Sequence, residues 1–191
     1  FNGLIDLDAQ LQPVPALAKS WEISTNLLTY TFHLRTDVNF CFVDKQGKVT
    51  TRKMVASDVA YSLSRIADPA TSSPGAWIFV GKIDSQLNRV FIAPNDSTFV
   101  LKLVSPAASL LGLLSTNFGY VVPKEYARLD KSYLARNPVG TGPFYVRRWE
   151  DEIKLVMRKN PHYHEKDTQG VPLPYLDAIN VTFVKNKQTA F

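Results

Sequence analysis

Residues 29–35 read TYTFHLR, in which apolar and polar side chains alternate without interruption. In an extended chain this places Tyr30, Phe32 and Leu34 on one face, because successive side chains of a strand point to opposite sides. The same period of two recurs at residues 98–104, 152–158 and 179–184, and a shorter strand is expected at residues 144–149. Such alternation is typical of strands that pack one face on a core and expose the other.

Helical periodicity is less frequent. One apolar stripe repeats at helical spacing and consists of Val55, Val59, Leu63 and Ile66. It predicts a helix over residues 56–67, with Val59 and Leu63 in the core. Ser105 and Pro106 are suited to open a second helix over residues 107–114, and a short third helix is expected at residues 124–129. Because strands and helices are interspersed, the pattern favours an α+β or mixed α/β fold.

The composition limits the class of protein. A chain of 191 residues is long enough for one large domain or two small ones. Its 45% hydrophobic and 20% charged residues exclude disordered, collagen-like and coiled-coil chains, which need very different compositions. The apolar runs of the sequence, such as residues 110–114 around one glycine, are far shorter than the roughly 20 apolar residues of a membrane-spanning helix.

The net charge of +5 is not concentrated in a basic block. The conspicuous basic pairs are Arg52-Lys53, Arg147-Arg148 and Arg158-Lys159. We interpret these pairs as strand and turn charges that face water, and we expect no nucleic-acid partner. Cys41 is the one cysteine of the sequence, so it cannot form an internal disulfide. It is expected to be a small buried hydrophobic residue.

Sequence motifs for catalysis are missing. There is no G-x-S-x-G for a nucleophile elbow and no G-x-x-x-x-G-K-[ST] for a phosphate-binding loop. Gly140-Thr141-Gly142-Pro143 begins like a dinucleotide-binding loop, but Pro143 lacks the backbone N–H that a phosphate needs. We interpret this segment as a tight turn whose glycines supply unusual backbone angles. We expect no catalytic residue and no cofactor.

Two further groups of polar residues are weighed as sites. His162 and His164 could bind a metal ion only together with Glu165 or Asp167, and a metal site needs three or four convergent ligands, so solvated turn histidines are the favoured interpretation. Asp151 and Glu152 are expected to be neighbours on a strand. Their side chains would then point to opposite faces, which makes them poor partners for acid–base catalysis.

Trp77 lies in a loop after the first predicted helix, where residues 72–79 read SSPGAWIF. An aromatic side chain in such a loop can line a ligand pocket or cap the core. The residues alone leave both interpretations open.

Several segments, taken in order, resemble the bacterial extracellular solute-binding proteins of family 5, the receptors of ABC importers for peptides, nickel and oligosaccharides. These segments are PALAKSWEIS at residues 15–24, LTYTFHLR at 28–35, VASDVAYSLSR at 55–65, NPVGTGPF at 137–144, RKNPHY at 158–163 and PYLD at 174–177. Two positions depart from the family pattern. Residues 41–47 replace a His/Trp-Asp-Gly sequence, and Val55 stands where a threonine usually caps the helix, a loss of about 1 kcal/mol.

The resemblance implies a type II periplasmic-binding-protein-like fold in which two lobes close on a ligand. Residues 1–191 would form a partial N-terminal lobe, α/β (mixed α+β) with a mixed β-sheet and flanking helices, without the second lobe. The implied function is that of the substrate-binding component of an ABC importer, which is not an enzyme. Its ligand would be a dipeptide or oligopeptide, although nickel chelates, haem and oligosaccharides bind to the same scaffold.

The resemblance also assigns roles to residues and partners. The loop of Trp77 would reach the cleft between the lobes and Asn117 would be a second ligand contact, whereas Tyr30, Phe32 and Leu34 would pack in the core. The expected partners are a peptide and the membrane permease subunits of the transporter. The expected location is periplasmic or extracellular, and a lipid anchor to the cell envelope is compatible with it. The alternative is the sensor domain of a transcription regulator. Upstream sequence separates the two, because an export signal supports the receptor and a DNA-binding helix pair supports the regulator.

Overall fold

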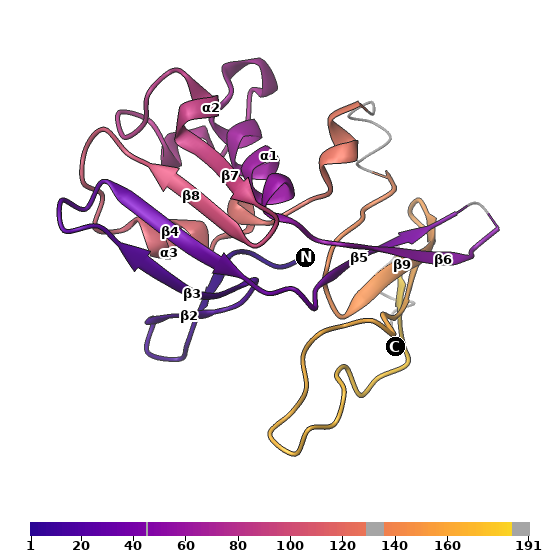
Figure 1. Cartoon of the computed structure of the whole chain (residues 1–191). Coiled ribbons are helices and arrows are strands. Elements are labelled where there is room, and N and C mark those ends of the chain that lie inside the picture. Colours follow the sequence, from indigo (N-terminus) through magenta and orange to yellow (C-terminus); the bar gives the residue numbers. More distant parts are fainter. Residues whose placement is uncertain (45, 129–135, 185–191) are drawn as a thin grey trace. The chain divides into compact units, whose positions relative to one another are not determined.

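The computed structural model of the chain describes residues 1–44, 46–128 and 136–184. The chain divides into two compact units (Figure 1). Unit 1 consists of Phe1–Asp37 and Met54–Lys124, and unit 2 consists of Val38–Lys53 and Glu125–Phe191. Among the described residues, none of the helices has the length and apolar character needed to cross a membrane.

Unit 1 is built on a four-stranded antiparallel sheet with the strand order β3-β4-β8-β7. Its strands are β3 (Ala18–Ile23), β4 (Thr29–Leu34), β7 (Phe91–Asn95) and β8 (Thr98–Lys102), and β1 (Ile5–Leu7) pairs with β2 (Pro13–Pro15) in a small second sheet. The helices are α1 (Ala56–Ala67), α2 (Leu87–Val90) and α3 (Leu110–Leu114), with the short 3-10 helices η1 (Pro69–Thr71), η2 (Ala76–Ile78) and η3 (Asn117–Gly119).

The core of unit 1 lies between this sheet and α1, which packs beside β7 and β8 (Figure 1). Phe32 of β4 pairs with Phe99 of β8, and their stacked rings lie 5.9 Å apart. Val59 and Leu63 of α1 are fully buried, as are the apolar residues of β4. The alternation at residues 29–35 and the stripe of α1 are therefore confirmed. The strand expected at residues 98–104 is confirmed as β8, which ends at Lys102.

The start of α1 is held by a buried carboxylate. Val55 occupies the N-cap and offers no side-chain hydrogen bond, as expected from its type. Asp58, which is fully buried, instead accepts a hydrogen bond from the Val55 N–H at 2.9 Å and another from the Lys124 N–H at 3.0 Å. Asp58 thereby satisfies a free amide of the helix start and fastens the chain at Lys124 to it.

Unit 2 contains two antiparallel sheets. β5 (Asn39–Val43) and β6 (Val49–Lys53) form a hairpin, and β9 (Phe144–Glu150), β10 (Lys154–Lys159) and β11 (Ala178–Thr182) form a sheet in the order β11-β10-β9. The 3-10 helix η4 (Lys124–Arg128) begins at the boundary of the units. Cys41 is buried in β5, which confirms the expectation for this residue.

The described strand pairs form four antiparallel sheets, and the expected mixed β-sheet is wrong in this respect. The reason lies in the connections. Most pairs are hairpins between strands that follow each other along the chain, and a hairpin pairs its strands antiparallel. The β4–β8 pair, which is distant in sequence, is antiparallel as well.

Several element boundaries differ from the expectation. The second helix begins at Leu110 and not at residue 107, because Ser105 is not its N-cap and instead donates its hydroxyl hydrogen bond to the Gly81 carbonyl at 3.1 Å. The third is a 3-10 helix, and its expected last residue, Leu129, lies outside the described residues. β10 begins at Lys154, so Asp151 and Glu152 lie in the turn before it and not on a strand.

The expected burial of the last strand is wrong. Val181 is 37% and Phe183 is 44% exposed, although their alternation predicts a buried face. Ile153 is exposed as well, because it belongs to the turn. Among the described strands of unit 2, β11 pairs with β10 alone and lies at the edge of the sheet.

Candidate functional site

Trp77 stands on the surface of unit 1, in the middle of η2, and is 51% exposed. The two residues that follow are buried: Ile78 is 0% and Phe79 is 2% exposed. Phe79 packs edge-to-face on Phe91 of β7, with 5.2 Å between the ring centroids. The buried neighbours fix the short helix on the core and leave the indole ring accessible.

The segment of Trp77 touches the segment of Asn117. Gly75, the N-cap of η2, lies so close to Phe118 that an added Cβ would stand 2.7 Å from its ring. Asn117 opens η3 and is exposed. The contact between Gly75 and Phe118 therefore brings the segments of both predicted ligand-binding residues together on unit 1.

An exposed apolar side chain lies three residues after each of these two residues along the chain. Val80 is 71% exposed, and Tyr120, which follows η3, is 38% exposed and stacks on Phe1 with 6.1 Å between the ring centroids. The Lys82 ammonium donates a hydrogen bond to the Ile78 carbonyl at 3.0 Å, so it is engaged with the backbone beneath Trp77. The surface thus offers ring area for stacking, and at Asn117 an amide that can donate and accept hydrogen bonds.

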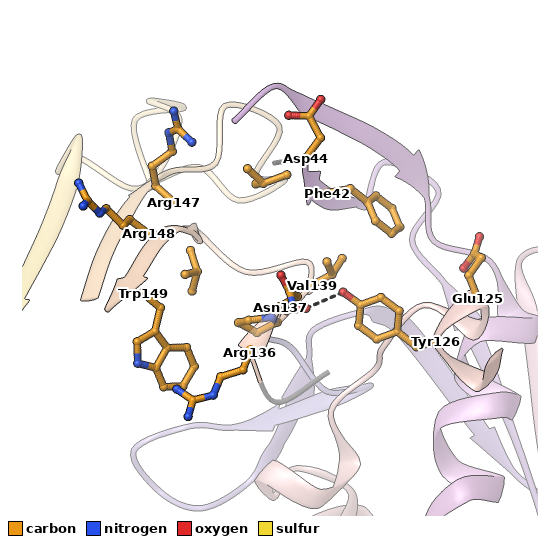
Figure 2. A pocket seen from close by; sticks show the side chains of 13 residues that line it. Phe42, Asp44, Glu125, Tyr126, Arg136, Asn137, Val139, Arg147, Arg148 and Trp149 are labelled. Atoms are coloured by element: carbon orange, nitrogen blue, oxygen red, sulfur yellow. Dashed lines mark hydrogen bonds between the residues drawn. The ribbon is translucent and has the colours of Figure 1, made fainter. Parts of the chain in front are cut away.

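Unit 2 contains a pocket of about 490 Å³ that the sequence did not indicate. Figure 2 shows Trp149 of β9 and Arg136 together on one side of this pocket, and Phe42 of β5 and Tyr126 on another. The Tyr126 hydroxyl donates a hydrogen bond to the Asn137 carbonyl at 2.7 Å. Val139, which also lines the pocket, is 8% exposed.

The interpretation of the basic pairs holds only in part. Arg147 and Arg148 are exposed, as expected, but they also line the pocket of unit 2. Arg52 is half-buried: its guanidinium lies 5.1 Å from the centre of the Phe40 ring and donates to the Glu125 carboxylate at 2.6 Å. A cation spread over an aromatic ring and paired with a carboxylate stabilises the unit.

The other polar residues singled out in the sequence do not converge. The described residues hold no group of three or more His, Cys, Asp or Glu side chains suited to a metal ion. His162 is exposed, in agreement with a solvated turn residue. For His164 that interpretation is wrong, because its side chain is only 2% exposed and lies edge-on against Tyr163, with 4.8 Å between the rings.

The turn at Gly140 and Gly142 is formed without unusual glycine angles. Positive φ values occur at Gly47, Gly81 and Gly170, and neither Gly140 nor Gly142 is among the described glycines that adopt them. Asn160 holds this turn instead, since its side-chain amide donates to the Gly142 carbonyl at 2.9 Å and its own N–H donates to the Pro143 carbonyl at 2.8 Å. Asn160 is 2% exposed, so the turn is fixed by a buried amide.

Comparison with known proteins places these observations in a family. Residues 12–191 match the family described as bacterial extracellular solute-binding proteins, family 5 Middle. The chain belongs to this family. The family is described as one of solute-binding proteins.

Among the relatives of this family 5 chain is the probable ABC transporter periplasmic-binding protein SapA of Escherichia coli (strain K12). It is 36% identical over 184 residues, which cover 91% of this chain and 32% of the relative. The dipeptide-binding protein of the same organism is 28% identical over 170 residues, or 81% of this chain and 31% of the relative. The chain thus spans about a third of the length of these curated relatives.

Solved structures confirm the fold class. One match is the ABC transporter-associated periplasmic binding protein DppA from Helicobacter pylori in complex with the peptide STSA. Its TM-score is 0.75 and its sequence identity is 32%, and the match covers 99% of this chain and 38% of the DppA chain. A dipeptide-binding protein from Pseudoalteromonas sp. SM9913, in complex with Met-Leu, has a TM-score of 0.78 and 25% identity with the same coverage of 99% and 38%. The chain is therefore part of a type II periplasmic-binding-protein fold.

Proposed function

We propose that this chain contributes one wall of the ligand-binding cleft of an ABC-importer receptor whose ligands are dipeptides or oligopeptides. The observation that carries the proposal is the half-exposed Trp77 on a buried anchor, next to the segment of Asn117, in a chain of family 5. Peptide is the favoured ligand because the relatives DppA of H. pylori and the E. coli dipeptide-binding protein are described as peptide binders.

In this proposal Trp77 stacks on a ligand side chain. The Asn117 amide donates a hydrogen bond to the peptide backbone or accepts one from it. A large ring on a rigid segment suits this role, because the ring supplies contact area at little entropic cost. The buried side chains of Ile78 and Phe79 keep the ring in place before the ligand arrives. The permease subunits of the transporter and a periplasmic or lipid-anchored location belong to the same proposal.

The test is a comparison of ligand classes on the complete polypeptide that carries this chain. Dipeptides, pentapeptides, a nickel–histidine chelate and a maltooligosaccharide are titrated by calorimetry under identical conditions. We expect heat of binding with peptides alone. Binding of the chelate or the sugar without peptide binding would contradict the peptide assignment, and a DNA-binding helix pair upstream of residue 1 would contradict the importer role.

A further inference from the structure

The pocket of unit 2 is a site distinct from the surface of Trp77, which belongs to unit 1. Its volume of about 490 Å³ lies within the range of small-molecule sites, about 300–1,000 Å³. Aromatic and aliphatic side chains form much of its wall, among them Phe42, Val139, Val146 and Trp149. These walls suit a ligand with an apolar body.

The charges around the pocket are mostly paired. The Arg136 guanidinium lies 5.3 Å from the centre of the Trp149 ring and also pairs with the Asp151 carboxylate. Arg148 pairs with Glu150, and Glu125 is held by Arg52. These contacts neutralise much of the charge that a ligand would otherwise meet.

Arg147 differs from its neighbours. Within the described part of the chain, no ion pair or side-chain hydrogen bond engages its guanidinium. The guanidinium lies against Gly47 in the β5–β6 turn, where an added Cβ would stand 1.9 Å from one of its nitrogens. Arg147 lines the pocket and therefore offers a cation with free donors at its edge.

The Asp44 carboxylate has the opposite effect, because its negative charge repels an anionic ligand. Asp44 also lines the pocket, but its Oδ1 accepts the Lys48 N–H at 2.8 Å, so one oxygen already serves the hairpin turn. Arginines outnumber carboxylates among the lining residues, three (Arg136, Arg147, Arg148) to two (Asp44, Glu125). Because Arg136, Arg148 and Glu125 are paired, Arg147 and Asp44 are the lining charges without an ion pair among the described residues, and of these two Arg147 is the one that attracts an anion.

We propose that this pocket binds a small organic carboxylate with an apolar or aromatic body. The carboxylate pairs with the Arg147 guanidinium, and the body lies among Phe42, Val139, Val146 and Trp149. An arginine matches a carboxylate well because its planar fork donates two parallel hydrogen bonds. The proposal does not depend on peptide binding at Trp77.

The probe is phenylacetate, titrated into the complete polypeptide by ligand-observed NMR or calorimetry, with phenylacetamide as its uncharged counterpart. We expect phenylacetate to bind and phenylacetamide to bind about tenfold or more weakly, since it lacks the charge that Arg147 recognises. Equal affinity for both compounds, or no binding of phenylacetate, would overturn the proposal.

Two variants locate the site. Arg147→Gln should lower the affinity for phenylacetate about tenfold or more, whereas Arg158→Gln, which removes the same charge from an exposed position on β10, should leave it unchanged. Val146→Phe should fill the pocket and abolish binding with the circular dichroism spectrum retained. An equal loss of phenylacetate affinity in both arginine variants would overturn the proposal, because it would mean that the net positive charge of the protein, and not Arg147, attracts the probe. Unaltered peptide affinity in Arg147→Gln would separate this site from that of Trp77.

Discussion

Leu63 is one of the fully buried residues in the core of unit 1. It lies on α1, within the stripe that faces β7 and β8. Leu63→Asp should lower the free energy of unfolding by about 4 kcal/mol or more, because an unpaired carboxylate would enter an apolar core. Val104→Asp is the control: Val104 is 58% exposed in the same unit, and its change should cost less than about 1 kcal/mol. Equal midpoints of urea unfolding for the two variants would contradict the assignment of the stripe.

Cys41 should make the free energy of unfolding decrease at alkaline pH. Burial raises the pKa of its thiol from 9.0 to about 11, because the thiolate is disfavoured in an apolar environment. Between these pH values the unfolded chain has released a proton that the folded chain keeps, so the thiol's contribution to stability falls as pH rises through this window.

The measurement is urea unfolding across that window for the wild type and Cys41→Ala. The wild type should lose stability relative to the variant as pH rises from 9.0 towards 11. Subtraction of the variant removes the titration of tyrosines and lysines. A difference that stays constant with pH would show that the thiol is not shielded.

At the level of elements, the start of α1 depends on one carboxylate. Asp58→Ala would leave two backbone N–H groups, those of Val55 and Lys124, without their acceptor. We expect a loss of about 3 kcal/mol, since each hydrogen bond to a charged group contributes about 1.5–3 kcal/mol. Asp84→Ala, which removes an exposed carboxylate bonded to the Gln86 N–H at 2.7 Å, should cost less than about 1 kcal/mol. Thermal unfolding of both variants measures these losses of stability. Equal losses in Asp58→Ala and Asp84→Ala would contradict the role of Asp58 as a buried acceptor.

Sequence periodicity predicted those elements whose packing is decided by their own side chains. β4 and α1 follow their patterns because each buries one complete face within unit 1. β11 carries the same alternation but has Val181 and Phe183 exposed, because a pattern does not say which surface will cover a strand. Ser105 failed as an N-cap because its hydroxyl bonds to Gly81, a contact made between distant residues.

The candidate site could be predicted only where one residue type stands out. Trp77 is an aromatic residue in a glycine- and proline-containing loop, which is a local signal, and its assignment to the ligand cleft, like that of Asn117, came from the resemblance to family 5. The contact between the two segments is visible only in the structure. The pocket of unit 2 has no such signal, because it is assembled from β5, β9 and residues near Tyr126 and Val139. Only folding brings these segments together.

For the molecule as a whole, affinity should depend on more than this chain. Pockets usually bury about 70–90% of a small ligand's surface, and a single wall covers much less. Each loss of about 1.4 kcal/mol weakens binding tenfold. We therefore expect the isolated 191-residue chain to bind short peptides weakly or not at all, while the complete polypeptide binds them measurably. Equally tight binding by both in calorimetric titrations would contradict a shared pocket.

The central claim is that Trp77 contacts the peptide, and one titration tests it most directly. A dipeptide is titrated by calorimetry into the complete polypeptide, its Trp77→Ala variant and its Leu27→Ala variant. Leu27 is the control because it is 49% exposed in the same unit, against 51% for Trp77, and lies in the turn between β3 and β4. We predict a loss of affinity of about tenfold or more in Trp77→Ala, none in Leu27→Ala, and unchanged melting temperatures in both. Wild-type affinity in Trp77→Ala would contradict the account and make Trp77 a surface residue without a role in binding.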